Sequence, residues 1–384
     1  MSLQYKTLRV KHYQLTKGSE TMKRVILSGY YGFKNAGDEA ILAALIDNLQ
    51  RSGADIEIIV LSANPEWTRS VHGVKAIGRT NITTLIHYLK GADLFISGGG
   101  SLLQDVTSNK TIPYYLGIIL LAKLFKVPVF FCAQGVGPIN HAFNHHLVKE
   151  VLNRVDLITV RDIESKELLE EIGIREAIHL TADPVFALQK SNQERIEEIF
   201  NREEIKVEEN ILGVSLRPWQ DNSYLRQMAK ILDGLKERLD INILFIPLHY
   251  PVDVEVSRRV AELMENKIEI INNSYTPQEL LGLMGEVEML LGVRLHSLIF
   301  AAINRVPLVG ISYDPKVDSF LNRLELSALA KIDNLDISKA IDEIVGIWDK
   351  KEDLQKGIKK KINNLEGLAH QNIELSLRIL GDNS

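Results

Sequence analysis

The residues best suited to chemistry in this sequence are a few arginines and one histidine, each placed just after a short apolar segment. Arg217 stands before Pro218, which disfavours a helix at Arg217 and predicts that its guanidinium lies in a loop. Arg294 and His296 are two positions apart, so in an extended segment both side chains would point to the same side. Arginine suits phosphate and carboxylate because its planar guanidinium can bond two oxygens at once. This set predicts a site that binds a small polyanion and moves a proton.

The other basic candidates are more ambiguous. Arg161 follows the apolar residues 157–160 and could either bind a ligand or act as a surface or helix-capping partner. His141 and His145 have the i, i+4 spacing of a metal site on a helix, but no third ligand completes the set. We therefore expect a solvated helix face at these two histidines and no structural metal.

Two glycine-rich segments of the first half also follow apolar segments. The first runs from Ser28 to Glu39 (SGYYGFKNAGDE), and the second runs from Ser97 to Asp105 (SGGGSLLQD). Glycines permit tight turns and a close approach of the backbone to a ligand, and the helix expected after the first segment offers free N–H groups. Helix capping and close packing are the competing interpretations. The spacing departs from G-x-G-x-x-G, so a nicotinamide cofactor gains no support.

The elements that position these loops are short apolar segments alternating with stretches of helical spacing. Such alternation is typical of βα units on a parallel sheet, where ligands bind beyond the carboxyl ends of the strands. The expected strands are 25–27, 56–61, 94–97, 129–133, 157–160 and 178–180, then 211–216, 241–248, 268–271, 289–293 and 308–311. Expected helices of the second series are 224–238, 254–265, 277–284 and 296–303. The sequence therefore predicts an α/β protein with two Rossmann-like domains facing each other across a cleft.

The domain boundary is expected near residue 190. The charged stretch 189–209 has helical spacing but few large apolar residues, which suggests a connection. This gives an N-terminal domain at 22–190 and a C-terminal domain at 191–384 that includes the helical tail. Residues 1–21 precede a second methionine and are expected to be a leader or tag outside the fold.

Composition excludes several classes of protein. The formal net charge of -5 provides no basic field, so we expect no nucleic-acid partner. A single cysteine, Cys132, fits a reducing compartment, and the polar N-terminus lacks the apolar core of a secretory signal. We expect a cytoplasmic protein. The apolar stretch 114–131 contains Lys123, Lys126 and Pro128, so it predicts a core helix, a turn and a strand rather than a membrane span.

Six ordered segments resemble the polysaccharide pyruvyltransferase family. They are SGYYGFKNAGDEAIL, SGGGSLLQD, AQGVGPI, TVRDIES, DPVF and GVRLHSLIFAAINRVP, and the resemblance covers about residues 23–330. It implies a fold like that of GT-B glycosyltransferases, phosphoenolpyruvate as donor, and N-acetylmannosamine in a lipid-linked cell-wall precursor as acceptor. A lipid-linked acceptor would be met at the inner face of the cell membrane, so the resemblance also implies peripheral membrane contact. No cofactor is implied.

The resemblance places the donor site at the triplet Arg294, Leu295 and His296. We expect Arg294 and Arg217 to hold the phosphate and carboxylate of phosphoenolpyruvate, with Arg161 contributing across the cleft. Ketal formation requires a proton at the methylene carbon, and we assign this general-acid role to His296, a role worth ~10² to 10⁴ in rate. The cationic side chains would replace a metal ion.

The acceptor is expected on the first domain, and its hydroxyl requires a base. Asp38 and Asp105 are both candidates for that base. The full set of expected acceptor-binding residues is Tyr31, Asn35, Asp38, Glu39, Gly99, Gly100 and Asp105.

Two other functions fit the same pattern. A nucleotide-sugar glycosyltransferase would need a carboxylate in the second domain for the donor ribose, and Glu286 and Glu288 are the available but poorly placed candidates. A non-catalytic carbohydrate-binding protein would account for the glycine-rich loops and aromatics. It gives no reason for Arg217, Arg294 and His296 to occur together.

Overall fold

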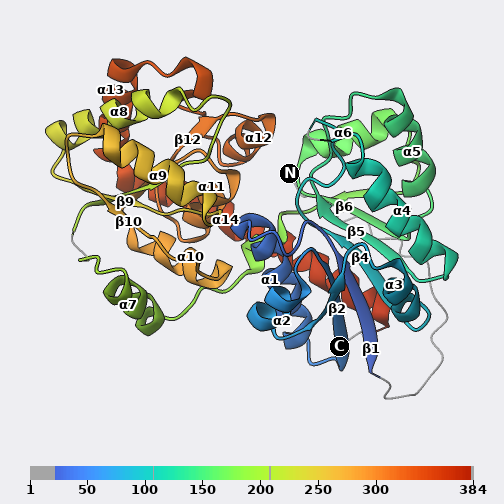
Figure 1. Cartoon of the computed structure of the whole chain (residues 1–384). Helices are drawn as coiled ribbons and strands as arrows, with labels where there is room; N and C mark the ends of the chain where they lie inside the picture. The colour runs from blue at the N-terminus through green and yellow to red at the C-terminus, as the bar shows by residue number, and fades with distance from the viewer. Residues whose placement is uncertain (1–21, 107, 207–208, 382–384) are drawn as a thin grey trace.

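Two parallel β-sheets, one in each half of the chain, dominate the molecule (Figure 1). The structure is a computed structural model that describes residues 22–106, 108–206 and 209–381. The expected leader or tag at 1–21 therefore lies outside the described residues. The two sheets confirm the prediction of two Rossmann-like α/β halves.

The first sheet has seven strands in the order β3-β2-β1-β4-β5-β6-β7. Its strands are β1 (Lys23–Ser28), β2 (Ile56–Ser62), β3 (Lys75–Gly78), β4 (Leu94–Gly98), β5 (Val129–Gln134), β6 (Leu157–Val160) and β7 (Ile178–Leu180). Its helices are α1 (Ala36–Arg51), α2 (Pro65–His72), α3 (Ile82–Leu89), α4 (Thr111–Leu124), α5 (Ala142–Leu152) and α6 (Ile163–Ile172), followed by the short η1 (Pro184–Ala187). The central strands are buried because helices cover both faces of a parallel sheet. The strand order reverses between β1 and β4, where open sheets of this kind bind ligands.

The second sheet has six strands in the order β10-β9-β8-β11-β12-β13. Its strands are β8 (Ile211–Ser215), β9 (Asn242–Phe245), β10 (Glu269–Ile270), β11 (Met289–Gly292), β12 (Leu308–Ser312) and β13 (Ala330–Lys331). The helical elements are α7 (Gln193–Arg202), α8 (Tyr224–Arg238), α9 (Val252–Leu263), α10 (Pro277–Leu283), η2 (Met284–Glu286), α11 (Leu295–Ile303), α12 (Pro315–Arg323), η3 (Ile332–Asn334), α13 (Ile337–Trp348) and α14 (Lys351–Leu380). Its strand order reverses between β8 and β11, so each half has its own switch point.

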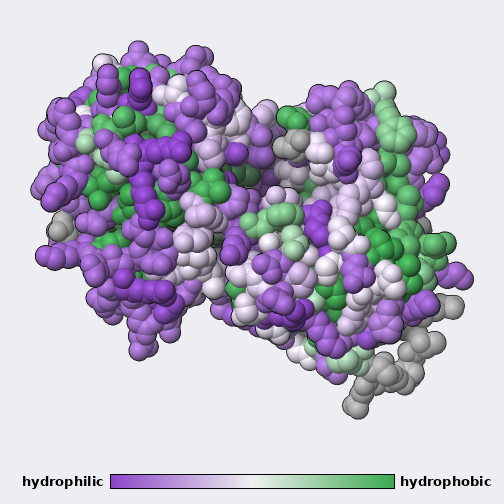
Figure 2. All heavy atoms as spheres, in the orientation of Figure 1, coloured by the Kyte–Doolittle hydropathy of each residue, from purple (hydrophilic) through white to green (hydrophobic). Residues whose placement is uncertain are grey.

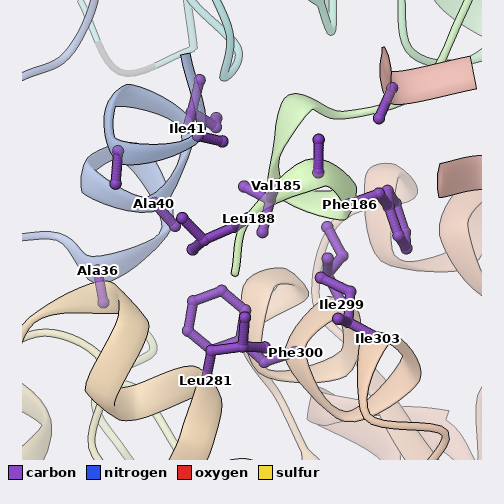
Figure 3. Close-up of a cluster of buried hydrophobic side chains, with 14 of the residues drawn as sticks. Ala36, Ala40, Ile41, Val185, Phe186, Leu188, Leu281, Ile299, Phe300 and Ile303 are labelled. Atoms are coloured by element: carbon purple, nitrogen blue, oxygen red, sulfur yellow. The ribbon is translucent and has the colours of Figure 1, made fainter. Parts of the chain in front are cut away.

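A buried apolar core joins the two halves (Figure 3). Ile41 of α1 and Phe186 of η1 come from the first half, while Leu281 of α10 and Phe300 of α11 come from the second, and all four belong to one buried cluster. Apolar packing of this kind fixes the position of one half on the other.

The last helix returns to the first sheet, although the sequence placed all C-terminal helices in the second domain. Figure 1 shows α14, in red, reaching from the second half to the first. Its buried Asn372 accepts from the Thr159 hydroxyl at 2.9 Å and donates to the Ala182 carbonyl at 3.0 Å. Helix α13 remains with the second half, where its Ala340, Ile344 and Trp348 join that half's core.

The apolar stretch 114–131 forms most of α4, a turn and the start of β5, as expected. Within the three described ranges, no helix combines the length and the apolar character that a membrane span requires.

Candidate active site

A cavity of about 520 Å³ lies between the two halves, lined by loops and helix ends that follow their strands. Figure 2 shows the molecule hollowed between the halves. The cavity walls carry five residues predicted to do chemistry: Arg161, Arg217, Arg294, His296 and Asp38. The site therefore sits where the rule for parallel sheets places a ligand.

The start of α1 brings Asp38 to the cavity. Asn35 caps this helix by accepting from the Gly37 N–H at 3.3 Å, and its amide donates to Asp38 Oδ2 at 2.7 Å. A Cβ on Gly100 would lie 2.8 Å from Asp38 Oδ1, so the glycine loop after β4 approaches closely. Desolvation by the surrounding protein raises the pKa of Asp38 to about 6, although His296 lowers it. This carboxyl can exchange a proton near neutral pH.

The His296 ring packs against the start of α1, across the junction of the two halves. A Cβ on Gly37 would lie 2.1 Å from His296 Nδ1, so only glycine fits there. The neighbouring loop makes a backbone link between the halves, since Ala36 N donates to Leu248 O at 2.9 Å. His296 Nε2 is buried and has no hydrogen-bond partner among the described residues. The residue itself lines the cavity.

A buried ion pair supports this histidine. Arg161 donates from Nη1 to Asp183 Oδ2 at 2.7 Å and from Nη2 to the Ser101 hydroxyl at 3.1 Å. His296 Nε2 lies 3.7 Å from the same Asp183 oxygen, which is too long for a hydrogen bond. Burial raises the pKa of Asp183, but His296 and Arg161 lower it to a net value of about 2. Asp183 is thus a fixed negative charge beside His296.

Asp183 was missed as a site residue. The sequence places it directly before Pro184 and three residues after the expected strand 178–180, and this strand-end position was the signal that could have found it. Its negative charge offsets the positive charge of the buried Arg161, so the two residues form one buried ion pair beside His296.

Arg294 differs from the expectation of an extended Arg-Leu-His segment. Helix α11 begins at Leu295, and Arg294 caps it with an extended backbone. The Arg294 guanidinium donates from Nε and Nη2 to the two oxygens of Asp253 at 2.5 and 2.6 Å. Asp253 is fully buried and also accepts from the His249 N–H at 2.9 Å. Arg294 lines the cavity with these two donor groups already engaged.

Two further cations complete the second-half wall. Arg217 lies in the loop after β8, as predicted, with its Cζ 4.2 Å from the centre of the Tyr313 ring. Lys316, in the first turn of α12, lines the cavity and pairs with Asp314 at 3.2 Å. Lys316 was not predicted, although its place just after the expected strand 308–311 could have suggested it.

Four of the expected acceptor residues lie outside the cavity lining. The Tyr31 hydroxyl donates to Gly98 O at 2.9 Å inside the core, and Glu39 Oε1 accepts from Gly32 N at 2.8 Å. A Cβ on Gly99 would lie 2.0 Å from Ile41, so this glycine allows close packing of the loop on α1.

Asp105 is the fourth expected acceptor residue that lies outside the cavity lining. It accepts from the backbone N–H groups of Asn140 and His141 at 2.8 to 3.0 Å and from the Asn144 amide at 2.9 Å. Burial raises the pKa of Asp105, but these hydrogen bonds bring it below its usual value. The carboxylate ties two loops together and is not turned to a substrate. Asn35, Asp38, Gly100 and the triplet residue Leu295 do line the cavity.

No group of three or more histidine, cysteine, aspartate or glutamate side chains within the described ranges could hold a metal ion. His145 instead bonds the Ile139 carbonyl through Nε2 at 2.8 Å.

Comparison with known proteins identifies relatives in polysaccharide biosynthesis. A family model described as polysaccharide pyruvyl transferase matches residues 35–315. The amylovoran biosynthesis protein AmsJ of Erwinia amylovora is 21% identical over 399 residues, covering 88% of this chain and 95% of that protein.

Solved structures with low sequence identity share the fold. MnaA of S. aureus, solved with UDP, has a TM-score of 0.63 at 15% identity and covers 94% of this chain and 98% of its own. A glycosyltransferase from Rickettsia africae has a TM-score of 0.62 at 16% identity, and the match covers 94% of this chain and 100% of that one. At these identities the likeness shows the fold alone, which is the predicted GT-B-like arrangement.

Proposed function

Since this chain belongs to the polysaccharide pyruvyl transferase family, we propose that it moves a pyruvyl group from phosphoenolpyruvate to a sugar and closes a 4,6-linked ketal. One observation carries the proposal: a single cavity is lined by Asp38, His296 and the cations Arg161, Arg217 and Lys316. Phosphoenolpyruvate carries a phosphate and a carboxylate, and these cations match that charge. The relative AmsJ, a biosynthesis protein of the polysaccharide amylovoran, supports a transferase acting on polysaccharide.

In the proposed donor site, Arg217 and Lys316 bind the phosphate and carboxylate from the second half. Arg161 lies on the first-half wall, where Asp183 and Ser101 already accept from its Nη1 and Nη2 and Asp183 offsets its charge. Arg294 contributes to the cavity wall, but its Nε and Nη2 are not available to the donor because they already donate to Asp253.

The proposed first step is proton transfer to carbon. Protonated His296 gives its proton to the methylene carbon of phosphoenolpyruvate, which becomes a methyl group. Asp183 stabilises the protonated histidine before this transfer. The transfer leaves positive charge on the adjacent carbon. A sugar hydroxyl attacks that carbon while Asp38 takes the hydroxyl proton. Asp38 is preferred over Asp105 because the oxygens of Asp105 are engaged in the protein.

The second step closes the ketal. The carbon–oxygen bond to phosphate breaks, and the phosphate leaves with that electron pair and the proton held by Asp38. A second hydroxyl of the same sugar attacks the same carbon, and its proton returns to His296. One phosphoenolpyruvate and one sugar thus give one ketal and one phosphate, with no redox change.

We propose as acceptor an N-acetylmannosamine residue in a lipid-linked cell-wall precursor, met at the cytoplasmic face of the membrane. The support is the set of family segments in the sequence, which includes the donor triplet at Arg294 to His296.

A nucleotide-sugar glycosyltransferase is the alternative favoured by fold, and the structure of MnaA was solved with UDP. Such a donor would need a carboxylate for its ribose. Of the described residues that line the cavity, those from the second half include no Asp or Glu. Glu286 instead accepts from Gln193, and Glu288 pairs with Lys351.

Calorimetry with phosphoenolpyruvate and with UDP-N-acetylglucosamine, side by side, tests the choice of donor. We expect saturable binding of phosphoenolpyruvate that weakens in Lys316→Ala, and no binding of the nucleotide sugar. Saturable binding of the nucleotide sugar alone would refute the proposal.

A further inference from the structure

An aromatic cluster of the first half, of which Tyr30 and Tyr115 line the cavity, has no part in the steps above. It consists of Tyr30 and Phe33 after β1, Arg79 after β3, and Tyr114 and Tyr115 in α4. The rings of Tyr30 and Phe33 stack with centroids 4.0 Å apart and planes 7° apart. Tyr30 lines the cavity and is 40% exposed, so a flat apolar ring is offered to whatever the cavity binds.

Arg79 holds this cluster together. Its Cζ lies 4.4 Å from the Tyr114 ring, 5.2 Å from the Phe33 ring and 5.6 Å from the Tyr115 ring. Its carbonyl accepts from the Tyr114 hydroxyl at 2.9 Å. Contacts of a guanidinium with three rings fix the rings in place before a ligand arrives, which reduces the entropy lost on binding.

Tyr115 is the residue of this cluster that most clearly indicates a ligand. Its side chain is 3% exposed and lines the cavity, yet its hydroxyl has no hydrogen-bond partner among the described residues. A buried hydroxyl without a partner costs free energy unless a ligand or water satisfies it. Burial raises the pKa of the Tyr115 hydroxyl, although the nearby Arg79 lowers it, so the hydroxyl keeps its proton and can donate it to a ligand.

We propose that Tyr115 and Tyr30 form the subsite for the acceptor sugar. The Tyr115 hydroxyl donates to an oxygen of a pyranose, and the exposed Tyr30 ring packs against the C–H face of that ring. A pyranose fits this pair because it presents polar edges and an apolar face together. The inference rests on the proposed function, since it places the acceptor within the same cavity.

The position of Asp38 agrees with this subsite. Asp38 lines the same cavity as Tyr30 and Tyr115. Burial is the main cause that raises the pKa of both tyrosines, and the negative charge of Asp38 adds to it. A sugar bound between the tyrosines would present a hydroxyl to the base.

Steady-state phosphate release with phosphoenolpyruvate and methyl β-N-acetylmannosaminide tests the subsite. Tyr115→Phe removes only the hydroxyl and is expected to raise KM for the sugar about 3- to 10-fold, the value of one neutral hydrogen bond. Tyr30→Ala should also raise that KM. KM for phosphoenolpyruvate should stay within about twofold of wild type in both variants, because neither side chain is placed in the donor site.

The matched control is Tyr88→Phe in α3, which removes a tyrosine hydroxyl outside the cavity lining. It should leave both KM values unchanged. An unchanged sugar KM in Tyr115→Phe, or an equal rise in KM for phosphoenolpyruvate, would overturn the subsite.

Saturation-transfer NMR separates the failure of the subsite from the failure of the proposed function. If the wild-type protein releases no phosphate, the function is wrong, but binding of the methyl glycoside can still be measured. Weaker saturation transfer in Tyr115→Phe and Tyr30→Ala than in wild type supports the subsite. Equal transfer in all three proteins, or transfer to uridine monophosphate and not to the sugar, refutes it.

Discussion

Asp38 and His296 are the residues that the proposed mechanism requires to exchange protons. They come from opposite halves of the chain, and both line the same cavity. The buried Asp183 and Arg161 keep a negative and a positive charge beside the histidine. Perturbed groups that gather in a cleft are typical of active sites.

The pH dependence of the rate tests the base. The pKa of Asp38 is raised to about 6, and a base acts only when ionised, so we expect kcat to rise as pH increases through about 6. Asp38→Asn should lower kcat by about 100-fold or more and abolish this rise. Asp47→Asn, on the same helix but outside the cavity lining, is the control. A rise through pH 6 that persists in Asp38→Asn would exclude Asp38 as the group responsible.

At the residue scale, strand-end position identified much of the site from sequence. Arg161, Arg217 and His296 lie on the cavity wall because parallel strands deliver their following residues to one edge. Sequence alone did not reveal partners far along the chain. The pairs Arg161–Asp183 and Arg294–Asp253 depend on how loops meet in space, and Asp253 lies within a helix that has no sequence motif.

At the scale of elements, the contact between α1 and α11 sets the geometry of the proposed acid. Helix α1 begins at a capped turn where Gly37 leaves room for the His296 ring. The start of one helix from each half thereby brings Asp38 and His296 together.

Gly37→Ala is the substitution that tests this contact. The new Cβ would lie 2.1 Å from His296 Nδ1, so the ring must move. We expect kcat to fall about 100-fold or more, the lower range for losing a general acid. Gly117→Ala in α4 is a matched control, because its Cβ meets nothing within 4 Å. A wild-type rate in Gly37→Ala would show that the position of His296 is not critical.

The regular elements could largely be predicted, since their apolar and polar residues alternate with clear periods. Helix α8 has the predicted bounds, and α11 begins one residue earlier than expected. Strand β9 ends at Phe245, although apolar residues continue to Leu248. The residues beyond β9 contact the first half instead of extending the strand, since Leu248 O accepts from Ala36 N and His249 forms a bridge with Asn35.

At the scale of the whole molecule, the two halves share one core and one final helix. The buried stripe of α14, with Ile358, Ile362, Leu365 and Ala369, belongs to the core that joins both halves. Sequence periodicity predicts a helix there, but an apolar stripe fits any apolar surface, so its partner sheet could not be foreseen.

Asn372 in α14 tests whether this helix positions the site. Its amide accepts from the Thr159 and Thr181 hydroxyls and donates to the Ala182 carbonyl. These three residues lie within two positions of Arg161 or Asp183. Asn372→Ala should lower the free energy of unfolding by about 2–4 kcal/mol, because buried polar groups left unpaired cost about 1–3 kcal/mol each. It should also lower kcat. Denaturant unfolding measures the first effect and phosphate release the second.

Asn364→Ala is the control for this prediction, since Asn364 is exposed on the same helix. It should change stability by no more than about 0.5 kcal/mol. A stable, fully active Asn372→Ala protein would contradict the positioning role of α14.

The central claim is that the protein protonates the methylene carbon of phosphoenolpyruvate and builds a ketal on a sugar. Mass spectrometry of an N-acetylmannosamine-containing acceptor, incubated with phosphoenolpyruvate in deuterated water, tests it most directly, with His296→Ala as the matched protein. The mechanism predicts that wild type adds a pyruvate ketal whose methyl group carries one deuterium, and that His296→Ala forms the product about 10² to 10⁴ times more slowly. An unmodified acceptor, or a ketal formed at the wild-type rate by His296→Ala, would contradict it.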